Sequence, residues 1–473
     1  MSDNKTQLVV IGGGPGGYAA AFMAADLDME VTLIDPELNP GGVCLYRGCI
    51  PSKALLHVAK LINESAEAED WGVTFAKPDI KLNKLRAWKE DVVGKLTGGL
   101  GQLVKQRKIN HIRGKAVFVD HHTLQITRND GQQDRLVFEH AVLATGSYPA
   151  TIPSFPPFSD RVMDSTKALE LKDIPQSLLV VGGGYIGLEL GTVYAALGTK
   201  VTVVEMMPGL LPGADRDLVN MLGKRIEKQF EAILLETKVV EMKGQKNQVK
   251  VKFEGANIEE KEKRFDKVLV AVGRKPNSAN LGLENTRIRL DDRGFVPVDK
   301  QRRTAEPSIF AIGDIVGEPM LAHKASHEGR TAVEVIAGGK ALFEPAAIPA
   351  VVFTDPEIAW CGLTETEAKK QQRDVKAVRF PWAASGRATT LGRSDGVTKL
   401  IIDAKTERVL GVGIAGPGAG ELIAEGVLAV EMAALVSDIS LTIHPHPTLS
   451  ETVMECADVF FGHSTHYYRP KRK

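Results

Sequence analysis

Two cysteines separated by four residues, Cys44 and Cys49, point most directly to chemistry in this 473-residue chain. Paired thiols can ligate a metal or form a disulfide. Four intervening residues do not match the usual zinc-binding spacing, and no second cysteine or histidine pair lies nearby, so we expect no metal site. A disulfide between the two is therefore the favoured interpretation.

Helix geometry restricts how these cysteines can be linked. Residues five positions apart on a regular α-helix are roughly 8–9 Å apart at Cα, whereas a disulfide tolerates at most about 7 Å. The segment must therefore bend, and Gly48 can supply the bend while Pro51 fits the first turn of a following helix. Cys49 then lies near a helix N-terminus, which stabilises a thiolate. Such a bent, accessible disulfide suits redox catalysis rather than cross-linking.

The alternative interpretation is a pair of unlinked thiols in a reducing compartment. The other two cysteines, Cys361 and Cys456, stand alone, and we expect both to be buried core thiols. Four cysteines in a chain of this length do not make the framework of a disulfide-rich secreted domain.

A histidine-rich segment near the C-terminus, residues 443–451, could supply an acid–base group. An imidazole can accept the proton of a dithiol, and a carboxylate can orient that imidazole. His446 with Glu451 could form this dyad. His444 is a rival that the spacing does not exclude, and structural histidines are the interpretation that spacing alone favours for both.

The elements that would position these groups contain an internal repeat. Residues 9–17 and 179–187 are each an apolar strand that ends in a glycine-rich turn and leads into a helix-like stretch. Each unit closes with a second apolar strand and an acid, Asp35 in the first and Glu205 in the second. Both turns carry the pattern Gly-x-Gly-x-x-Gly, formed by Gly12, Gly14 and Gly17 and by Gly182, Gly184 and Gly187.

This β-α-β pattern is typical of dinucleotide binding. Its glycines allow a tight turn, close approach of a pyrophosphate and close helix–strand packing, and the closing acid accepts hydrogen bonds from a ribose. Two complete copies predict two dinucleotide sites. Glu205 would repel a 2′-phosphate, and the next arginine after it is Arg216, so the sequence favours NAD over NADP.

Three later apolar strands also end at glycines. Residues 141–145 precede Gly146, and residues 268–272 precede Gly273, so these strands would close the two units, with the second unit inserted in the first. The third strand leads into Gly313 and Asp314. Asp314 could accept hydrogen bonds from the sugar-alcohol hydroxyls of a flavin, or could equally be a turn aspartate.

Composition argues against several classes of protein. Lysine plus arginine and aspartate plus glutamate number 59 each, so no net charge favours nucleic acid or an anionic membrane. The basic run at residues 469–473 is interpreted as a solvated terminus. The most apolar stretch, residues 178–198, contains Glu189 and several glycines, so no membrane span is expected. No leader pattern is recognised, and we expect a cytoplasmic protein.

The motifs together resemble those of the dihydrolipoamide dehydrogenases, within the class I pyridine nucleotide-disulfide oxidoreductases. The resemblance runs in order from about residue 7 to 460. It includes the cysteine segment, both glycine patterns, the Gly313-Asp314 segment, and residues 273–277, 320–323, 381–387 and 443–451. It implies an α/β fold with two Rossmann-like domains, a central domain and an α+β interface domain. The implied ranges are 1–150 for FAD, 151–274 for NAD, 275–345 for the central domain and 346–473 for the interface.

The resemblance also implies roles for individual residues. Cys44 would exchange with the lipoyl sulfur, Cys49 would face the flavin as a thiolate, and Lys53 would lie near the flavin, paired with Glu189. His446, oriented by Glu451, would act as the base across a homodimer interface. The remaining predicted cofactor residues are, for FAD, Gly12, Gly14, Gly17, Asp35, Thr145, Gly146 and Asp314, and, on the NAD side, Gly182, Gly184, Gly187, Glu205 and Gly273.

The implied reaction oxidises protein-bound dihydrolipoyl groups and reduces NAD⁺, with a lipoyl-carrying E2 acyltransferase or a glycine-cleavage H protein as partner. Tyr46 and Arg47 depart from the commoner Asn-Val or Asn-Arg between the cysteines, which leaves the substrate preference open. A glutathione-reductase-like enzyme would carry arginines after Glu205, and a non-catalytic subunit would lack part of the Cys-Cys-His-Glu set; both remain alternatives. Which lipoyl carrier is served does not follow from the sequence.

Overall fold

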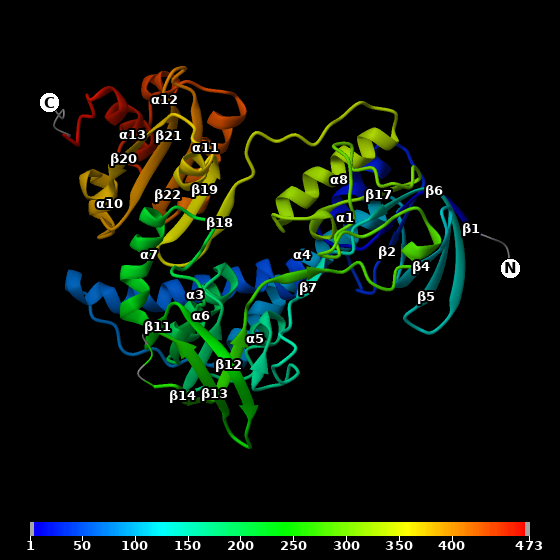
Figure 1. Ribbon diagram of the computed structural model, residues 1–473, viewed down its shortest axis with the longest axis horizontal. Coiled ribbons are helices and arrows are strands. Elements are labelled where there is room, and N and C mark those ends of the chain that lie inside the picture. The colour runs from blue at the N-terminus through cyan, green and yellow to red at the C-terminus, as the bar shows by residue number, and fades with distance from the viewer. Residues whose placement is uncertain (1–3, 257, 259, 469–473) are drawn as a thin grey trace.

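The computed structural model describes residues 4–256, 258 and 260–468, so the basic run at 469–473 lies outside the described residues. Figure 1 shows the N-terminal and C-terminal parts of the chain in separate lobes, with the second glycine-rich unit below them. Among the described residues, no helix has both the length and the apolar content to cross a membrane.

The first sheet has seven strands and contains the first glycine-rich unit. Its parallel part pairs β1 with β2 and β6, and β2 with β3, while β4 and β5 join β6 as an antiparallel extension. Six of its strands are β1 (Asn4–Ile11), β2 (Val31–Ile34), β3 (Asn110–Ile112), β4 (Gly114–Asp120), β5 (Thr123–Arg128) and β6 (Gln133–Leu143), and the seventh, β17 (Ile309–Ala311), comes from much later in the chain. The helices of this region are α1 (Pro15–Asp26), α2 (Gly42–Arg47), α3 (Cys49–Glu67), η1 (Ala68–Trp71) and α4 (Leu82–Gln106).

The second sheet repeats the arrangement with five parallel strands in the order β11-β10-β9-β15-β8. Its strands are β8 (Val162–Met163), β9 (Ser177–Val181), β10 (Lys200–Val204), β11 (Ala232–Leu234) and β15 (Lys267–Val270). Its helices are α5 (Ser165–Glu170), α6 (Tyr185–Ala196) and α7 (Arg216–Gln229). An antiparallel sheet beside it consists of β12 (Thr237–Gly244), β13 (Val249–Gly255) and β14 (Glu262–Phe265).

The second sheet is inserted in the first, as its sequence position predicted. Two short antiparallel strands connect them, β7 (Ser147–Pro149) and β16 (Arg274–Pro276). The chain then returns through η2 (Leu283–Asn285) to the first sheet, where β17 (Ile309–Ala311) pairs with β6 in parallel. After η3 (Gly313–Val316), helix α8 (Ala322–Ile336) packs against α1. Residues 275–345 therefore contribute to the first sheet rather than forming a sheet of their own.

The C-terminal lobe has an antiparallel sheet in the order β18-β19-β22-β21-β20 with helices packed against it. Its alternation of strands and helices matches the predicted α+β region. The strands are β18 (Ala350–Val352), β19 (Glu357–Gly362), β20 (Val375–Pro381), β21 (Val397–Asp403) and β22 (Val409–Gly416). The helices are α9 (Glu365–Lys370), η4 (Trp382–Ala384), α10 (Gly386–Thr390), α11 (Ala419–Glu431), α12 (Val436–Leu441) and α13 (Glu451–Phe461).

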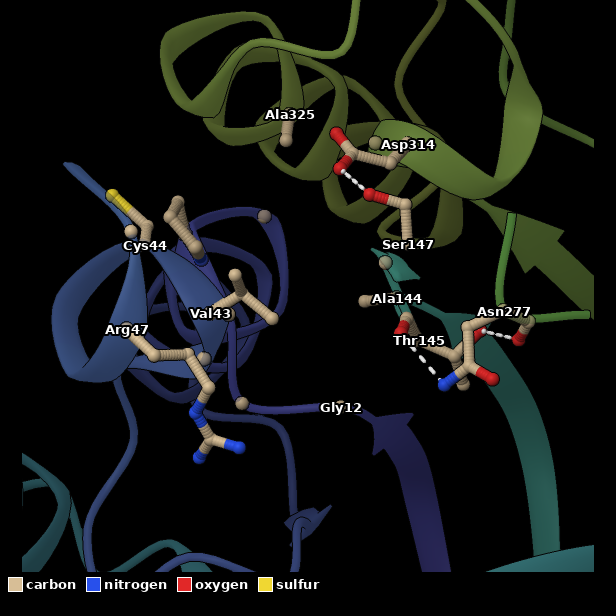
Figure 2. Close-up of a pocket in the computed structure, with 18 of the residues that line it drawn as sticks. Gly12, Val43, Cys44, Arg47, Ala144, Thr145, Ser147, Asn277, Asp314 and Ala325 are labelled. Carbon is tan, nitrogen blue, oxygen red and sulfur yellow. Dashed lines mark hydrogen bonds between the residues drawn. The ribbon is translucent and has the colours of Figure 1, made fainter. Parts of the chain in front are cut away.

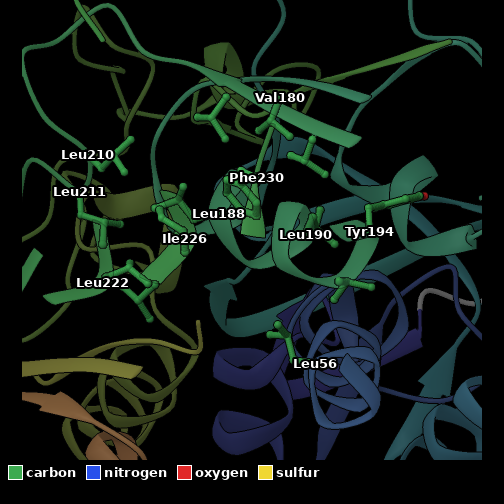
Figure 3. Packing of buried hydrophobic residues seen from close by; sticks show 14 of the residues in the cluster. Leu56, Val180, Leu188, Leu190, Tyr194, Leu210, Leu211, Leu222, Ile226 and Phe230 are labelled. Carbon is green, nitrogen blue, oxygen red and sulfur yellow. The ribbon is translucent and has the colours of Figure 1, made fainter. Parts of the chain in front are cut away.

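A shared hydrophobic cluster fixes the cysteine-bearing helix α3 against the second sheet. Leu56 of α3 belongs to the same buried cluster as Leu188 of α6 and Ile226 of α7, as Figure 3 shows. Full burial of a leucine side chain stabilises a fold by about 1.5–3 kcal/mol. The register of α3, and with it the start of the helix at Cys49, is therefore held by packing between the two glycine-rich units.

A buried ion cluster fastens the C-terminal lobe to the second sheet. The side chain of Lys399 on β21 is 1% exposed, and its Nζ lies 2.6 Å from Asp215 and 2.9 Å from Asp217 at the start of α7. Asp215 also accepts the backbone N–H groups of Glu365 and Thr366, at 3.0 Å each. A buried lysine is tolerated only with such partners, so this cluster specifies how the two regions dock.

Candidate active site

The chain bends between the two cysteines at the predicted position. Helix α2 ends at Arg47, Gly48 has φ −143° and ψ −113°, and α3 begins at Cys49. A Cβ atom on Gly48 would lie 2.8 Å from the carbonyl oxygen of Val43, so the bend requires glycine there. Pro51 lies in the first turn of α3. Cys49 is thus the first residue of a 19-residue helix, as the sequence predicted.

The two thiols of the reduced pair differ in acidity. A hydrogen bond from Cys44, aided by the positive charge of Lys53, lowers the pKa of the Cys49 thiol to about 7 against the opposing effect of burial. The same hydrogen bond, together with burial, raises the pKa of Cys44 well above its usual value. Of the two thiols, Cys49 is therefore the one that ionises first, and its thiolate accepts a hydrogen bond from protonated Cys44. This agrees with the prediction that Cys49 is the cysteine whose thiolate is stabilised.

The remaining cysteines are inert by comparison. Cys361 and Cys456 are 1% and 0% exposed, and burial raises the pKa of each thiol to about 12. Cys361 lies on β19 and Cys456 on α13, within the core of the C-terminal lobe. The prediction that both are buried core thiols is confirmed.

Lys53 and Glu189 join the two glycine-rich units beside the thiols. Lys53 Nζ lies 2.7 Å from Glu189 Oε2, and its charge lies 4.5 Å from the ring centroid of Phe353. Glu189, on α6, is 3% exposed and also accepts the N–H of Phe353 at 3.0 Å. This pair, 136 positions apart in sequence, brings a fixed positive charge next to Cys49.

The first glycine turn has the geometry of a phosphate-binding turn. Gly12 adopts φ +108°, and a Cβ atom on Gly17 would lie 1.8 Å from the carbonyl oxygen of Gly12. Asp35 accepts the N–H of Gly13 at 2.6 Å and that of Glu37 at 2.9 Å. Burial raises the pKa of Asp35. The acid is thus held at the end of β2, next to the turn.

The second turn repeats these contacts. Gly182 also adopts φ +108°, and a Cβ atom on Gly187 would lie 2.4 Å from the carbonyl oxygen of Gly182. Glu205 accepts the N–H of Gly183 at 2.7 Å and that of Met207 at 2.8 Å. The two closing acids therefore hold equivalent positions in the two units.

A cavity of about 600 Å³ opens from the first turn and reaches the thiols, at the size typical of cofactor sites. Figure 2 shows Cys44 and Arg47 on one side of it, and Ser147 and Asp314 on the other. It brings together ten of the predicted site residues, namely Gly12, Gly14, Asp35, Cys44, Cys49, Lys53, Thr145, Gly146, Glu189 and Asp314. The predicted residues that do not line it are Gly17, Gly182, Gly184, Gly187, Glu205, Gly273, His446 and Glu451.

Several residues of this cavity have no individual assignment from the sequence. Arg274 donates from Nε to the Ser147 hydroxyl at 2.7 Å, and that hydroxyl donates to Asp314. Thr145 donates from its hydroxyl to the carbonyl of Asn277 at 2.8 Å. The contacts of Arg274 and Asn277 lie at the β7–β16 connection, and the Ser147–Asp314 contact joins β7 to η3. Arg274 and Asn277 belong to the motif 273–277, which marked the segment but gave no pairing.

The structure separates the two histidine candidates. His446 Nδ1 lies 2.9 Å from Glu451 Oε1, and the His446 side chain is 70% exposed. His444 Nε2 lies 2.8 Å from Glu425, and the His444 side chain is only 5% exposed. His446 is therefore the histidine that is both oriented by a carboxylate and accessible.

Tyr46 and Arg47 turn away from the thiols toward the loop after Asp35. The Tyr46 hydroxyl donates to the carbonyl of Asn39 at 3.0 Å, and Arg47 forms an ion pair with Glu37. Both residues thus attach the helix that carries Cys44 to the loop at residues 36–41.

Comparison with known proteins decides the family. The pyridine nucleotide-disulphide oxidoreductase model matches residues 6–329, and the dimerisation-domain model of the same name matches residues 348–457. The chain belongs to the pyridine nucleotide-disulphide oxidoreductase family. The resemblance drawn from the motifs, and the fold class with its two dinucleotide-binding regions and C-terminal dimerisation domain, are thereby confirmed.

The chain is 50% identical to the dihydrolipoyl dehydrogenase of Haemophilus influenzae, over 99% of this chain and 98% of that protein. It is 48% identical to that of Vibrio cholerae, over 99% and 98%. LpdA from Mycobacterium tuberculosis has a similar structure, with a TM-score of 0.90, 27% identity, and coverage of 96% of this chain and 99% of that one. The activity of the chain is that of a dihydrolipoyl dehydrogenase, a flavoprotein disulfide oxidoreductase, and the Cys44–Cys49 pair fits its redox-active disulfide.

Proposed function

We propose that the chain oxidises dihydrolipoyl groups carried on a protein through the Cys44–Cys49 disulfide and passes the electrons by way of FAD to NAD⁺. The observation that carries the proposal is the position of the thiol pair. Both cysteines line the cavity that begins at the first glycine turn, with the low-pKa thiol at the start of a helix. FAD, when bound, supplies two-electron transfer between a thiolate and a nicotinamide.

The residues of this cavity fit FAD. A Cβ atom on Gly14 would have its nearest neighbour at 3.9 Å, so the glycine leaves open space at the N-terminus of α1, where a pyrophosphate is favoured. Asp35 offers carboxylate oxygens for ribose hydroxyls, and Asp314 does so for sugar-alcohol hydroxyls at the far end. We assign Gly12, Gly14 and Gly17 to the turn, and Thr145 and Gly146 to the wall.

Thiol exchange explains why the two cysteines need different pKa values. One thiolate of the dihydrolipoyl group attacks the Cys44 sulfur, forms a mixed disulfide and releases Cys49 as a thiolate. The second lipoyl thiolate then closes the lipoyl disulfide and releases Cys44, which takes up a proton. Cys49, with a pKa near 7, is the better leaving group of the two. Lys53, held by Glu189, stabilises the charge that remains on it.

His446 is the proposed base, and it would act in a homodimer. It does not line the thiol cavity of its own chain, it is exposed, and Glu451 holds its Nδ1 so that Nε2 is free to take a proton from the dihydrolipoyl thiol. The dimerisation domain exposes a row of apolar side chains typical of a subunit interface, namely Leu428, Met432, Leu441 and Ile443. A second copy packed there would present its His446 to the thiols of the first.

The second unit is the proposed NAD site, with Gly182, Gly184, Gly187 and Gly273 around the turn and Glu205 for the ribose. The contacts of Arg216 support the proposed preference for NAD. Arg216 donates to the carbonyl oxygens of Leu210 and Ala214, at 2.6 Å each, and also to that of Leu211. These contacts occupy the arginine, so it does not offset repulsion between Glu205 and a 2′-phosphate.

A second cavity, of about 550 Å³, is the proposed route of the lipoyl arm. Its wall includes the apolar side chains of Phe22 and Leu27, which suit an aliphatic chain. Tyr18 also lines it and lies close enough to the thiols for their charges to raise its pKa, after the larger effect of burial.

The carrier would be the E2 acyltransferase of a 2-oxo-acid dehydrogenase complex or a glycine-cleavage H protein. Buried thiols at Cys361 and Cys456 fit a reducing compartment, and we propose the cytoplasm.

Anaerobic reduction of the purified yellow protein with dihydrolipoamide tests the proposal. We expect a two-electron state with a long-wavelength absorbance band from a thiolate beside oxidised flavin, followed by NADH formation when NAD⁺ is added. An intact flavin that gives neither the band nor NADH would overturn the assignment of Cys44 and Cys49. The variant His446→Gln distinguishes the role of the base from that of the thiols. The absorbance band should still form in this variant, but more slowly than in the wild type.

A further inference from the structure

Arg47, which precedes Gly48 between the two cysteines, is placed by contacts on two sides. Its guanidinium pairs with Glu37, and both residues line the proposed FAD cavity. Its neighbour Tyr46 accepts the N–H of Asn39 at 3.3 Å and donates to the Asn39 carbonyl at 3.0 Å. Figure 2 shows Arg47 extending from α2 in a different direction from the Cys44 sulfur. Arg47 therefore belongs to the cavity wall rather than to the approach to the disulfide.

The loop that receives these contacts is itself fixed. A Cβ atom on Gly101 of α4 would lie 2.1 Å from Asn39 Oδ1, so Asn39 is packed tightly against that helix. Gly41 donates its N–H to the carbonyl of Gly13 in the first glycine turn, at 2.7 Å. The loop at residues 36–41 thus connects α4, the glycine turn and the cysteine helix. A side chain anchored on this loop has a defined position relative to the turn.

The charges along this wall explain what Arg47 can do. Asp35 and Glu37 place two carboxylates beside a turn that would hold a doubly negative pyrophosphate. Burial raises the pKa of Asp35, and the N–H of Gly13, the charge of His111 and, least of the three, the charge of Arg47 oppose that rise, so Arg47 lies within electrostatic reach of this carboxyl. The other cations that line the cavity are Lys53, which is bound to Glu189, Arg274, which donates to Ser147, and Lys115 on β4. Arg47 is held on the same wall as the ribose acid, with a planar group that can donate to phosphate or ribose oxygens.

We propose that Arg47 holds the pyrophosphate–ribose half of FAD, that Glu37 orients its guanidinium, and that Tyr46 fixes the helix from which it extends. The inference rests on the proposed FAD site. It gives the Tyr46–Arg47 pair a role in flavin retention rather than in substrate choice. It also couples the flavin to Cys44, because the same six-residue helix carries Cys44 and Arg47.

The rate of flavin release from the purified holoenzyme tests the inference. Flavin fluorescence that appears after dilution, at a fixed temperature below unfolding, reports release without any turnover. We expect Arg47→Gln to accelerate release about 10- to 100-fold, the effect of losing a hydrogen bond between charged groups. Arg128→Gln is the matched control, because Arg128 pairs with Asp134 in the same sheet and does not line the cavity. The control should release flavin at the wild-type rate.

Ionic strength and two further variants show whether Arg47 contacts FAD directly or only attaches α2 to the loop at residues 36–41. The ratio between Arg47→Gln and wild-type release rates should narrow as salt rises, because salt screens a contact between charges. Glu37→Gln should accelerate release less than Arg47→Gln, since the guanidinium remains, and Tyr46→Phe less still. Equal rates for Glu37→Gln and Arg47→Gln, or a salt-independent ratio, would overturn direct contact with the flavin. If Arg47→Gln fails to fold, Arg47→Lys, which keeps the charge and loses the planar fork, replaces it; it should still release flavin faster than the wild type, and a wild-type release rate would overturn the role of the planar group.

Failure of the inference can be told from failure of the proposed function. A purified wild-type protein that carries no FAD contradicts the proposed FAD site itself. A yellow wild-type protein whose Arg47→Gln variant releases flavin at the wild-type rate contradicts only the role of Arg47.

Discussion

The two glycine-rich units have nearly the same local geometry but lie in different surroundings. Gly12 and Gly182 share a φ of +108°, and both closing acids accept one N–H from the turn and one from two residues further along the chain. The surroundings differ. The first turn opens into the cavity that contains Cys44 and Cys49, whereas the turn residues and closing acid of the second do not line that cavity.

The segments that come after the two closing acids account for the difference. After Asp35 the chain forms α2 and α3, which carry the thiols and are packed against the second unit through Leu56. After Glu205 come Met206 and Met207, which are 59% and 46% exposed. The same local motif thus lies beside a thiol pair in one place and beside two exposed methionines in the other. Local geometry fixes the class of ligand, and the neighbouring elements fix the chemistry.

Replacement of Cys44 by serine is the strongest test of this division. We expect oxidation of dihydrolipoamide to fall on the order of 10³-fold or more, because the first sulfur exchange has no target. FAD should remain bound, since the turn and Asp35 are untouched. NADH-dependent reduction of ferricyanide should also remain, because it uses only the flavin and the second unit. Cys456→Ser is the control for both assays, and loss of FAD in Cys44→Ser would contradict the separation of roles.

His446→Gln should have the next largest effect. Loss of a general base lowers turnover about 10²- to 10⁴-fold, and we expect this in dihydrolipoamide oxidation but not in ferricyanide reduction by NADH. His463 is also an exposed histidine, and it lies near Asp458, a carboxylate on α13, the helix that carries Glu451. His463→Gln is therefore the matched control. If both variants behave alike, His446 has no special place in the reaction.

Glu205→Ala tests the second unit by itself. Loss of hydrogen bonds between a carboxylate and the ribose should lower kcat/KM for NAD⁺ about 10- to 100-fold and narrow the preference over NADP⁺. Reduction of the flavin by dihydrolipoamide should be unchanged when measured in the absence of nucleotide. A preference for NAD⁺ that survives the substitution would show that another feature excludes the 2′-phosphate.

The acidity of Cys49 gives the smallest and most specific effect. In the reduced protein, alkylation by iodoacetamide should rise with an apparent pKa of about 7, while Cys361 and Cys456 stay unmodified until the protein unfolds. The pKa of Cys49 is lower in the folded than in the unfolded state. It therefore contributes stability above the ordinary thiol pKa, and this contribution is lost as the pH falls through 7. Cys49→Ser should remove that pH dependence from the unfolding free energy of the reduced protein.

Much of the site could be predicted from the sequence because its signals are local. The bend at Gly48, the helix start at Cys49 and the two glycine turns depend on residues within one turn or one strand of each other. The choice between His444 and His446 could not be made in this way. It depends on tertiary packing, in which His444 is buried and bonded to Glu425 of α11 while His446 stays exposed.

The contacts of Arg274 with Ser147 and of Lys53 with Glu189 could not be predicted from local spacing either. Each joins segments more than 100 positions apart, and each depends on the insertion of the second sheet into the first. Arg216 illustrates the same limit. The sequence marks it as the nearest arginine after Glu205, but only its backbone partners show that it is occupied.

The order of amino acids already specifies which chemistry the chain can perform, because thiols, glycine turns and closing acids act through their immediate covalent neighbours. Folding in three dimensions is needed to specify where those groups meet. The Lys53–Glu189 pair and the choice between His444 and His446 arise from contacts with distant segments, and electrostatic effects depend on distance in space rather than along the chain.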